Sequence, residues 1–315
     1  GSSAASDVYK RQDILRIWVV ASDYSEDLKI DNQIINYQID SYRKIRNTLR
    51  FLLGNLNNFN KQTLVDPEEM PELERYLLTR ISSLNEKLKE LVSKHDYHAI
   101  YTALLNFCTL ELSAFYFDIR KDSLYCDDIK SIKRRSTSTC LHIIFEFLTK
   151  WLSPIVSFTC EEAWKSRSYS NEESILLQNV KDDEFTYKDI SLEKVFEELK
   201  RVRKSVTSAL ELKRNEKLIG SSLQAKVILF LSKDIQKIIT DLDLAEMCIV
   251  SNVETHDISN RSKEAISIED EEIYVEIKLA DGKKCERCWA VLQEVSSSKN
   301  NLCNRCDDVW KTFQK

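Results

Sequence analysis

The chain of 315 residues is 43% hydrophobic, enough for two or three domains with their own cores, and has a formal net charge of -5 at pH 7. Such an acidic body excludes general coating of nucleic acid by a basic surface, so contact with a polyanion requires a local patch. The four glycines are too dispersed for a dinucleotide or P-loop site, and without an 18-residue apolar run or a signal core we expect a cytoplasmic protein that contacts no membrane.

The first elements expected along the chain are two helices. A short helix is predicted from Asp13, in the sequence DILRIWVVAS, and a long helix from about Asn32 to Asn57. The polar link NKQTLVDPEEMPE follows and contains two of the three prolines, which indicates a boundary.

The long helix has two different faces between Asp40 and Phe59. At about 100° per residue, its apolar side chains form one stripe: Tyr42, Ile45, Leu49, Leu52, Leu53 and Leu56. A second, mostly basic stripe consists of Arg43, Arg46, Asn47 and Arg50. This stripe is either a solvated charged face or a face that contacts phosphates. Gly54 continues it, and we expect the missing side chain to let another backbone come close.

Three further segments predict helices that pack together. Residues 72–92 have an apolar residue every three or four positions, and residues 97–124 are apolar around most of the helix. Residues 132–164 contain Pro154, which should bend or divide their helix. These segments and the preceding helix predict an antiparallel bundle of four or five helices.

The pattern changes after the bundle. A charged helix is expected at 192–214, a strand at 225–231, a helix at 233–244 and two further strands at 265–268 and 273–279. This succession predicts a small α/β or α+β module separate from the bundle.

Four of the nine cysteines form a regular pattern. Cys285, Cys288, Cys303 and Cys306 make two CxxC pairs with fourteen residues between them. Two such pairs can place four thiolates around Zn²⁺, and a complete shell of four thiolates is structural because no coordination position stays open. The surrounding tail has little apolar core, so the metal must supply much of its folding free energy. The alternative is two disulfides or redox-active pairs.

Two side chains of this tail are suited to RNA. Trp289 directly follows one cysteine, and Arg287 lies between two. An indole can stack on an unpaired base, and a guanidinium can bond to a base edge. Trp289 is equally suited to be the small core of the knuckle. The four histidines have no metal-ligand spacing and no nucleophile and base pair is evident, so we expect no catalysis by this chain alone.

Several motifs occur in the order typical of one family. They are DILRIWVVASDYSEDLKI, SYRKIRNTLRFLLGNLNNF, LSPIVSFTCEEAW, RNEKLIGSSLQAKV, GKKCERCW and LCNRC. From Asp13 to about Val309 the chain thereby resembles bacterial isoleucyl-tRNA synthetases. Valyl and leucyl relatives share several of these motifs, whereas GxKCxRCW is more particular to the isoleucine enzymes. Residues 1–12, GSSAASDVYKRQ, do not resemble the family and are interpreted as a tag or artefact.

The resemblance implies a part of a class I aminoacyl-tRNA synthetase, which joins isoleucine to tRNA(Ile) with ATP. The catalytic and editing domains would precede Asp13, so ATP would bind only the full-length enzyme and this fragment would be inactive. Residues 13–30 would be the connection from the catalytic domain, 31–170 the helical anticodon-binding domain, 171–280 a linker and small α/β module, and 281–315 the zinc-binding domain. The expected fold is therefore mainly α, an antiparallel bundle followed by an α/β module and a four-cysteine zinc knuckle.

The resemblance also implies roles for the residues singled out above. The basic stripe would hold the anticodon stem and loop, Arg287 and Trp289 would contact its bases, and one structural zinc ion would bind the cysteines of a monomer. Two alternatives stay open. One is a zinc-stabilised helical scaffold that binds protein, and the other is the same region of another class I synthetase.

Overall fold

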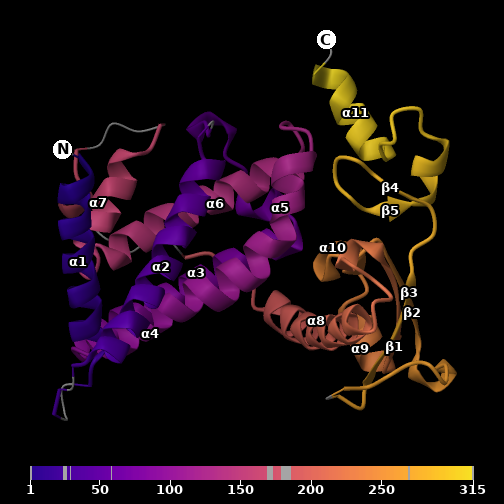
Figure 1. The fold of residues 1–315 in the computed structure, drawn as a ribbon, viewed down its shortest axis with the longest axis horizontal. Coiled ribbons are helices and arrows are strands. Elements are labelled where there is room, and N and C mark those ends of the chain that lie inside the picture. The colour runs from indigo at the N-terminus through magenta and orange to yellow at the C-terminus, as the bar shows by residue number, and fades with distance from the viewer. Residues whose placement is uncertain are drawn as a thin grey trace. The chain divides into compact units, whose positions relative to one another are not determined.

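The computed structural model describes residues 2–23, 27–28, 30–57, 59–168, 173–178, 186–268 and 270–313 (Figure 1). The chain forms two compact units: residues 1–120 with 130–188, and residues 121–129 with 189–315. Nothing in the sequence pattern indicates that residues 121–129 group with the second unit. The domain boundaries expected at residues 30, 170 and 280 stay predictions.

The first unit consists of long helices joined by short turns. In chain order the elements are α1 (Ser2–Ala21), α2 (Asn32–Asn55), η1 (Lys61–Thr63), η2 (Pro67–Glu69), α3 (Glu72–Ser93), α4 (Tyr97–Asn106), the π-helical η3 (Phe107–Tyr116), α5 (Phe117–Cys126), α6 (Ile132–Leu152), α7 (Ser157–Lys165) and η4 (Ile175–Leu177) (Figure 1). The expected helical bundle is confirmed, and the last predicted helix is divided at Pro154. Helix α1 begins at Ser2 rather than near Asp13, but among residues 8–21 only Asp13 and Ile17 are buried.

Local signals explain where several of these helices begin. Asp31, Asp96 and Ser131 each cap a helix by accepting a hydrogen bond from the backbone N–H three residues further on, at 2.7, 3.0 and 3.2 Å. The apolar stripe of α2 is buried as expected at five positions, with Leu53 half-buried: Tyr42, Ile45, Leu49, Leu52 and Leu56. Periodicity therefore predicted correctly which face of α2 enters the core.

A polar cluster lies inside the core of this unit. Arg120 Nε and Nη2 donate to the two carboxylate oxygens of Glu74 at 2.6 and 2.7 Å. The hydroxyls of Tyr116 and Thr137 donate to Glu74 Oε1 at 3.0 and 3.2 Å. All four side chains are buried, so each charge depends on its partner for stabilisation. The cluster ties α3 to α6 and to the helix that runs through η3.

The second unit contains a mixed sheet with helices and a small tail that holds four of the cysteines. Its elements are α8 (Ser191–Asn215), η6 (Ser222–Gln224), β1 (Ala225–Leu231), α9 (Lys233–Ile238), α10 (Leu244–Cys248), β2 (Asn252–Asp257), η7 (Ile258–Asn260), β3 (Ile273–Leu279), β4 (Lys283–Lys284), β5 (Val291–Leu292), η8 (Gln293–Ser297) and α11 (Asn304–Phe313). The larger sheet has the order β2-β1-β3, with β2 parallel and β3 antiparallel to β1. Helix α8 packs against β3, which confirms the expected α/β module.

Three details of this module differ from the prediction. The strand expected at 265–268 is reduced to one bridge, from Ile266 to Val275. The helix expected at 233–244 is shorter, because α9 ends at Ile238. Strand β2 was not predicted, since its sequence NVETHD is polar, and most of its side chains are exposed at the sheet edge. An edge strand with exposed faces lacks the apolar alternation on which strand prediction relies.

Candidate metal centre and nucleic-acid interface

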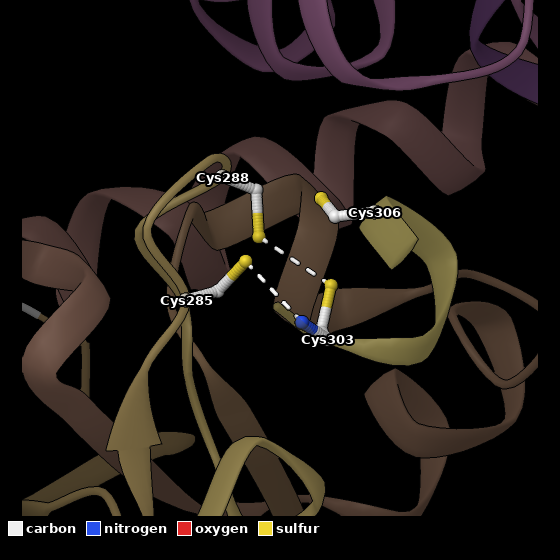
Figure 2. Close-up of side chains that lie close together, drawn as sticks. All are labelled: Cys285, Cys288, Cys303 and Cys306. Atoms are coloured by element: carbon white, nitrogen blue, oxygen red, sulfur yellow. Dashed lines mark hydrogen bonds between the residues drawn. The ribbon is translucent and has the colours of Figure 1, made fainter. Parts of the chain in front are cut away.

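The four predicted metal ligands lie together in the tail. Cys285 follows β4, Cys288 lies in the turn before β5, Cys303 precedes α11 and Cys306 lies in its first turn. All four Sγ atoms lie within 4.8 Å of one another, and Figure 2 shows the side chains directed toward a common centre. Cys288 Sγ and Cys303 Sγ are 3.8 Å apart. Tetrahedral Zn²⁺ with Zn–S bonds of about 2.3 Å requires sulfurs about 3.8 Å apart, so the geometry fits zinc.

The surroundings of these sulfurs also fit a structural ion. All nine cysteines are free thiols, so the disulfide alternative is wrong for this structure. Three of the four ligands are buried, and the backbone N–H of Cys303 donates to Cys285 Sγ at 3.4 Å. The pKa of the Cys288 thiol is raised to about 11, and the largest cause is its hydrogen bond to Cys303. Clustered thiolates need a cation to offset their repulsion, and four of them leave it no open position.

A tight turn in the backbone shapes the first cysteine pair. Gly282 has φ +116°, and a Cβ there would lie 2.2 Å from the carbonyl oxygen of Leu292, so only glycine fits. After the pair, the N–H of Trp289 donates to the carbonyl oxygen of Cys285 at 2.9 Å, and Trp289 itself has φ 70°. This left-handed residue lies in the turn that leads into β5.

Trp289 is exposed and is not the core of the knuckle. Its side chain is 60% exposed, and Lys284 Nζ lies 5.0 Å from the centroid of its ring. The buried residues around the sulfurs are instead Cys126 and Val295, with Leu292 and Leu302 packed against them. The alternative that made Trp289 a structural core residue is therefore wrong. Its exposed ring has the accessibility that base stacking requires.

Arg287 is engaged within the protein. Its Nη1 donates to the carbonyl oxygen of Cys126 at 2.6 Å, and its Nη2 donates to that of Tyr125 at 3.0 Å. Arg305 donates to carboxylate oxygens of Asp122 and Asp127 at 2.6 and 3.0 Å. The sequence reasoning missed this association, because no local pattern links the end of α5 to residues about 160 positions later.

The basic stripe of α2 is uneven. Arg43, Asn47 and Arg50 are exposed, and Arg43 forms an ion pair with Asp40 at 3.0 Å that is itself open to solvent. Arg46 is more buried, and it donates to the two carboxylate oxygens of Glu162 in α7 at 2.8 and 3.3 Å. Arg50 and Asn47 are thus the better placed of the four for a contact outside the protein.

Gly54 does not serve the role expected of it. It is exposed on α2, and among the described residues no atom outside its own helix lies within 4 Å of the Cβ position. No backbone of the described residues occupies this space, so the prediction of a close backbone approach is wrong for the part of the protein that the structure describes.

One helical stretch is long and apolar enough to be considered as a membrane span. It runs from Tyr97 to Cys126, and half of its most apolar window is buried inside the protein. Its α4 and η3 portions pack against α1, α2 and α3. This burial is typical of a core helix, as the apolar circumference of residues 97–124 suggested.

Two protein families match parts of the chain. Residues 74–229 match the anticodon-binding domain of tRNA ligase, and residues 282–309 match the zinc finger found in FPG and IleRS. The second match contains all four clustered cysteines together with Arg287 and Trp289. The stripe of α2 lies before the first match begins.

Curated relatives match almost the whole chain. The isoleucine–tRNA ligase of Pelagibacter ubique is 44% identical over 293 residues, which are 91% of this chain and 31% of the relative. Those of Gluconobacter oxydans and Ruegeria pomeroyi are 40% and 39% identical over 97% and 94% of this chain, again 31% of each relative. The resemblance inferred from the motifs is confirmed. Nearly the whole chain therefore aligns with about a third of the length of each of these isoleucine–tRNA ligases. This aligned part contains the match to the anticodon-binding domain of tRNA ligase and the match to the zinc finger.

Proposed function

We propose that this chain recognises the anticodon stem and loop of tRNA(Ile) as part of a longer isoleucine–tRNA ligase. The observation that carries the proposal is that one chain matches both the anticodon-binding domain and the zinc finger, and aligns with an isoleucine–tRNA ligase over 91% of its length. In the longer enzyme, domains outside this chain would use ATP to activate isoleucine and transfer it to the tRNA. The chain alone would support no isoleucine-dependent pyrophosphate exchange.

Two surfaces divide the work of RNA binding in this proposal. Exposed residues of the α2 stripe, above all Arg50 and Asn47, contact the RNA backbone and set its position without reading its sequence. Trp289 stacks on an unpaired base of the loop, with the cationic Lys284 close to its ring. Arg46 contributes less than the stripe pattern alone would predict, because Glu162 occupies its guanidinium.

One structural Zn²⁺ per chain is part of the proposal. It would bind Cys285, Cys288, Cys303 and Cys306, and would hold the turn that presents Trp289. Because the shell is complete, the ion takes no part in bond making at a substrate. We further propose that the chain acts as a monomer in the cytoplasm.

A salt titration of tRNA binding tests the proposal. Binding of tRNA(Ile) to the zinc-loaded chain should weaken steeply as salt rises, because each phosphate contact releases counterions. Unrelated tRNAs should bind more weakly at every salt concentration, since bases are read as well as phosphates. Absence of binding at low salt would overturn the proposal. Equal affinity for tRNA(Ile) and another class I tRNA would favour a different synthetase.

A zinc-stabilised scaffold that binds protein is the alternative from another functional class. An apolar protein interface would give an affinity almost independent of salt, so the same titration with a candidate protein partner distinguishes the two functions.

A further inference from the structure

The end of α5 belongs structurally to the zinc finger. Residues 121–129 fall in the same compact unit as the cysteine cluster. The thiol of Cys126 is buried among the zinc-ligand sulfurs and Val295, and it donates to the carbonyl oxygen of Arg287 at 3.9 Å. A segment outside the matched zinc finger therefore completes its core.

Arg287 binds this segment through two of its guanidinium nitrogens. The last carbonyls of a helix have no partner within the helix, and the helix dipole favours a cation beside them. Arg287 supplies hydrogen-bond donors and a positive charge at this helix end, because two of its nitrogens donate to the consecutive carbonyls of Tyr125 and Cys126. Arg305 also binds the same segment, through ion pairs with Asp122 and Asp127. A guanidinium held in this way is oriented toward the protein.

The segment presents an exposed aromatic ring. Tyr125 lies on the last turn of α5 and is 60% exposed, the same fraction as Trp289. Its carbonyl is fixed by Arg287, which lies two residues before Trp289 in the knuckle. The exposed Lys283 and Lys284 add positive charge to this module. Two exposed aromatic rings linked through Arg287 offer the faces on which proteins stack unpaired bases.

We propose that Tyr125 is a second residue that stacks on an unpaired base of the bound RNA, and that Arg287 is a positioning residue that fixes Tyr125 to the zinc module. The inference rests on the proposed function, because it identifies a further contact of the same RNA. It changes the role of Arg287 from a base or phosphate ligand to a support for Tyr125.

A double-mutant cycle on tRNA(Ile) binding tests the proposal. We expect Tyr125→Ala and Arg287→Ala each to weaken binding about tenfold, as the loss of one base stack does. The double variant should be no weaker than either single variant, because both changes remove the same contact. Tyr125→Phe, the matched control, should bind within about twofold of the wild type. The slope of log affinity against log salt should stay unchanged in all of them.

Hydrogen exchange and zinc content separate positioning from other causes. Amides of residues 121–127 should exchange faster in Arg287→Ala than in the wild type, while both chains retain one zinc ion. If Arg287→Ala loses its zinc, tRNA binding by Arg287→Lys and by Tyr125→Ala tests the proposal instead. Neither of these changes removes a cysteine of the cluster.

Two outcomes would overturn the inference. One is wild-type binding by Tyr125→Ala. The other is a salt slope that falls in magnitude by about 0.7 to 0.9 in Arg287→Ala, with effects that add to those of Tyr125→Ala, because that result identifies a direct phosphate contact. A wild-type chain that binds no tRNA would instead refute the proposed function. The exchange measurement would still test whether Arg287 holds residues 121–127 in place.

Discussion

The exposed indole of Trp289 is the clearest functional signal from a single residue. A large aromatic ring gains most from burial, yet this one is 60% exposed on a backbone that has φ 70°. The zinc knuckle keeps its own core without the indole, through Val295 and Cys126. The ring is therefore available for a partner, and its replacement should leave the metal centre intact.

We predict that Trp289→Ala weakens binding of tRNA(Ile) by about 1 to 3 kcal/mol, the range for the loss of one stacked base. Zinc content should stay at one ion per chain, because the indole is not part of the buried cluster. Trp289→Phe, which keeps an aromatic face, should lose less. Titration of tRNA and metal analysis of the same samples measure both effects, and a Trp289→Ala chain with normal affinity and normal zinc would refute the stacking role.

A second residue-scale prediction concerns pH. Burial, followed by the nearby cations Lys61, Arg167 and Lys150, lowers the pKa of His142 to about 4. Its ring stacks on Phe59, with centroids 4.7 Å apart. In the unfolded chain the imidazole takes up its proton at about pH 6.5, so the unfolded state binds more protons than the folded state between about pH 6.5 and 4.

The free energy of unfolding should accordingly fall as pH falls through this window, by up to about 3 kcal/mol from His142 alone. Above about pH 6.5 the histidine contributes no pH dependence. Urea unfolding at a series of pH values, followed by helical circular dichroism, measures the effect. His142→Phe should have a flatter profile than the wild type between pH 4 and 6.5, and two parallel profiles would contradict the assignment.

At the scale of elements, helix α2 shows how one periodic pattern serves two purposes. The apolar stripe enters the core through Tyr42 and Leu49, while the second stripe, about 100° around the helix, faces solvent through Arg43 and Arg50. Arg46 lies between these roles, because its bond to Glu162 ties α2 to α7. Sequence spacing placed all four stripe residues on one face but gave no information about Glu162, which lies more than 100 residues further on.

We predict that Arg50→Ala weakens binding of all tRNAs alike and reduces the magnitude of the salt slope by about 0.7 to 0.9, the loss of one phosphate contact. Arg46→Ala should change the slope less. Lys44→Ala is the matched control, because Lys44 is exposed on the same helix about 100° around from Arg43. An equal change of slope in Lys44→Ala would show that the stripe is not a specific contact face.

At the scale of the whole chain, the two compact units have separate cores. The helical unit buries long apolar faces and the Glu74–Arg120 cluster, whereas the buried side chains among residues 282–313 are three of the clustered cysteines, Val295 and Val309. We therefore expect the stability of the tail, but not that of the helical unit, to depend on a bound metal ion.

We predict that chelation of zinc unfolds residues 282–309 while most of the helical circular dichroism signal remains. The expected change at 222 nm is small, and readdition of zinc should restore tRNA affinity. Without any chelator, Cys303→Ser should already behave like the chelated wild type. Cys248→Ser, which changes a buried cysteine outside the cluster, should retain zinc. Cooperative loss of all helical signal on chelation would contradict the separation of cores.

The sequence alone determined much of this protein. Helical periodicity predicted the bundle and the buried face of α2, since a repeat near 3.6 residues places apolar side chains on one side of a helix. Two CxxC pairs predicted the metal site, because the spacing of each pair fixes the geometry of two ligands locally. The order of the motifs alone carries the resemblance to isoleucyl-tRNA synthetases.

The tertiary structure alone decided which side chains are available. It paired Arg46 with Glu162, directed Arg287 to the end of α5 and left Trp289 exposed. It also paired the polar edge strand β2 with β1 and buried Glu74 against Arg120. Each of these pairings depends on a partner distant in sequence, and local spacing carries no information about such partners because they meet only when separate elements pack.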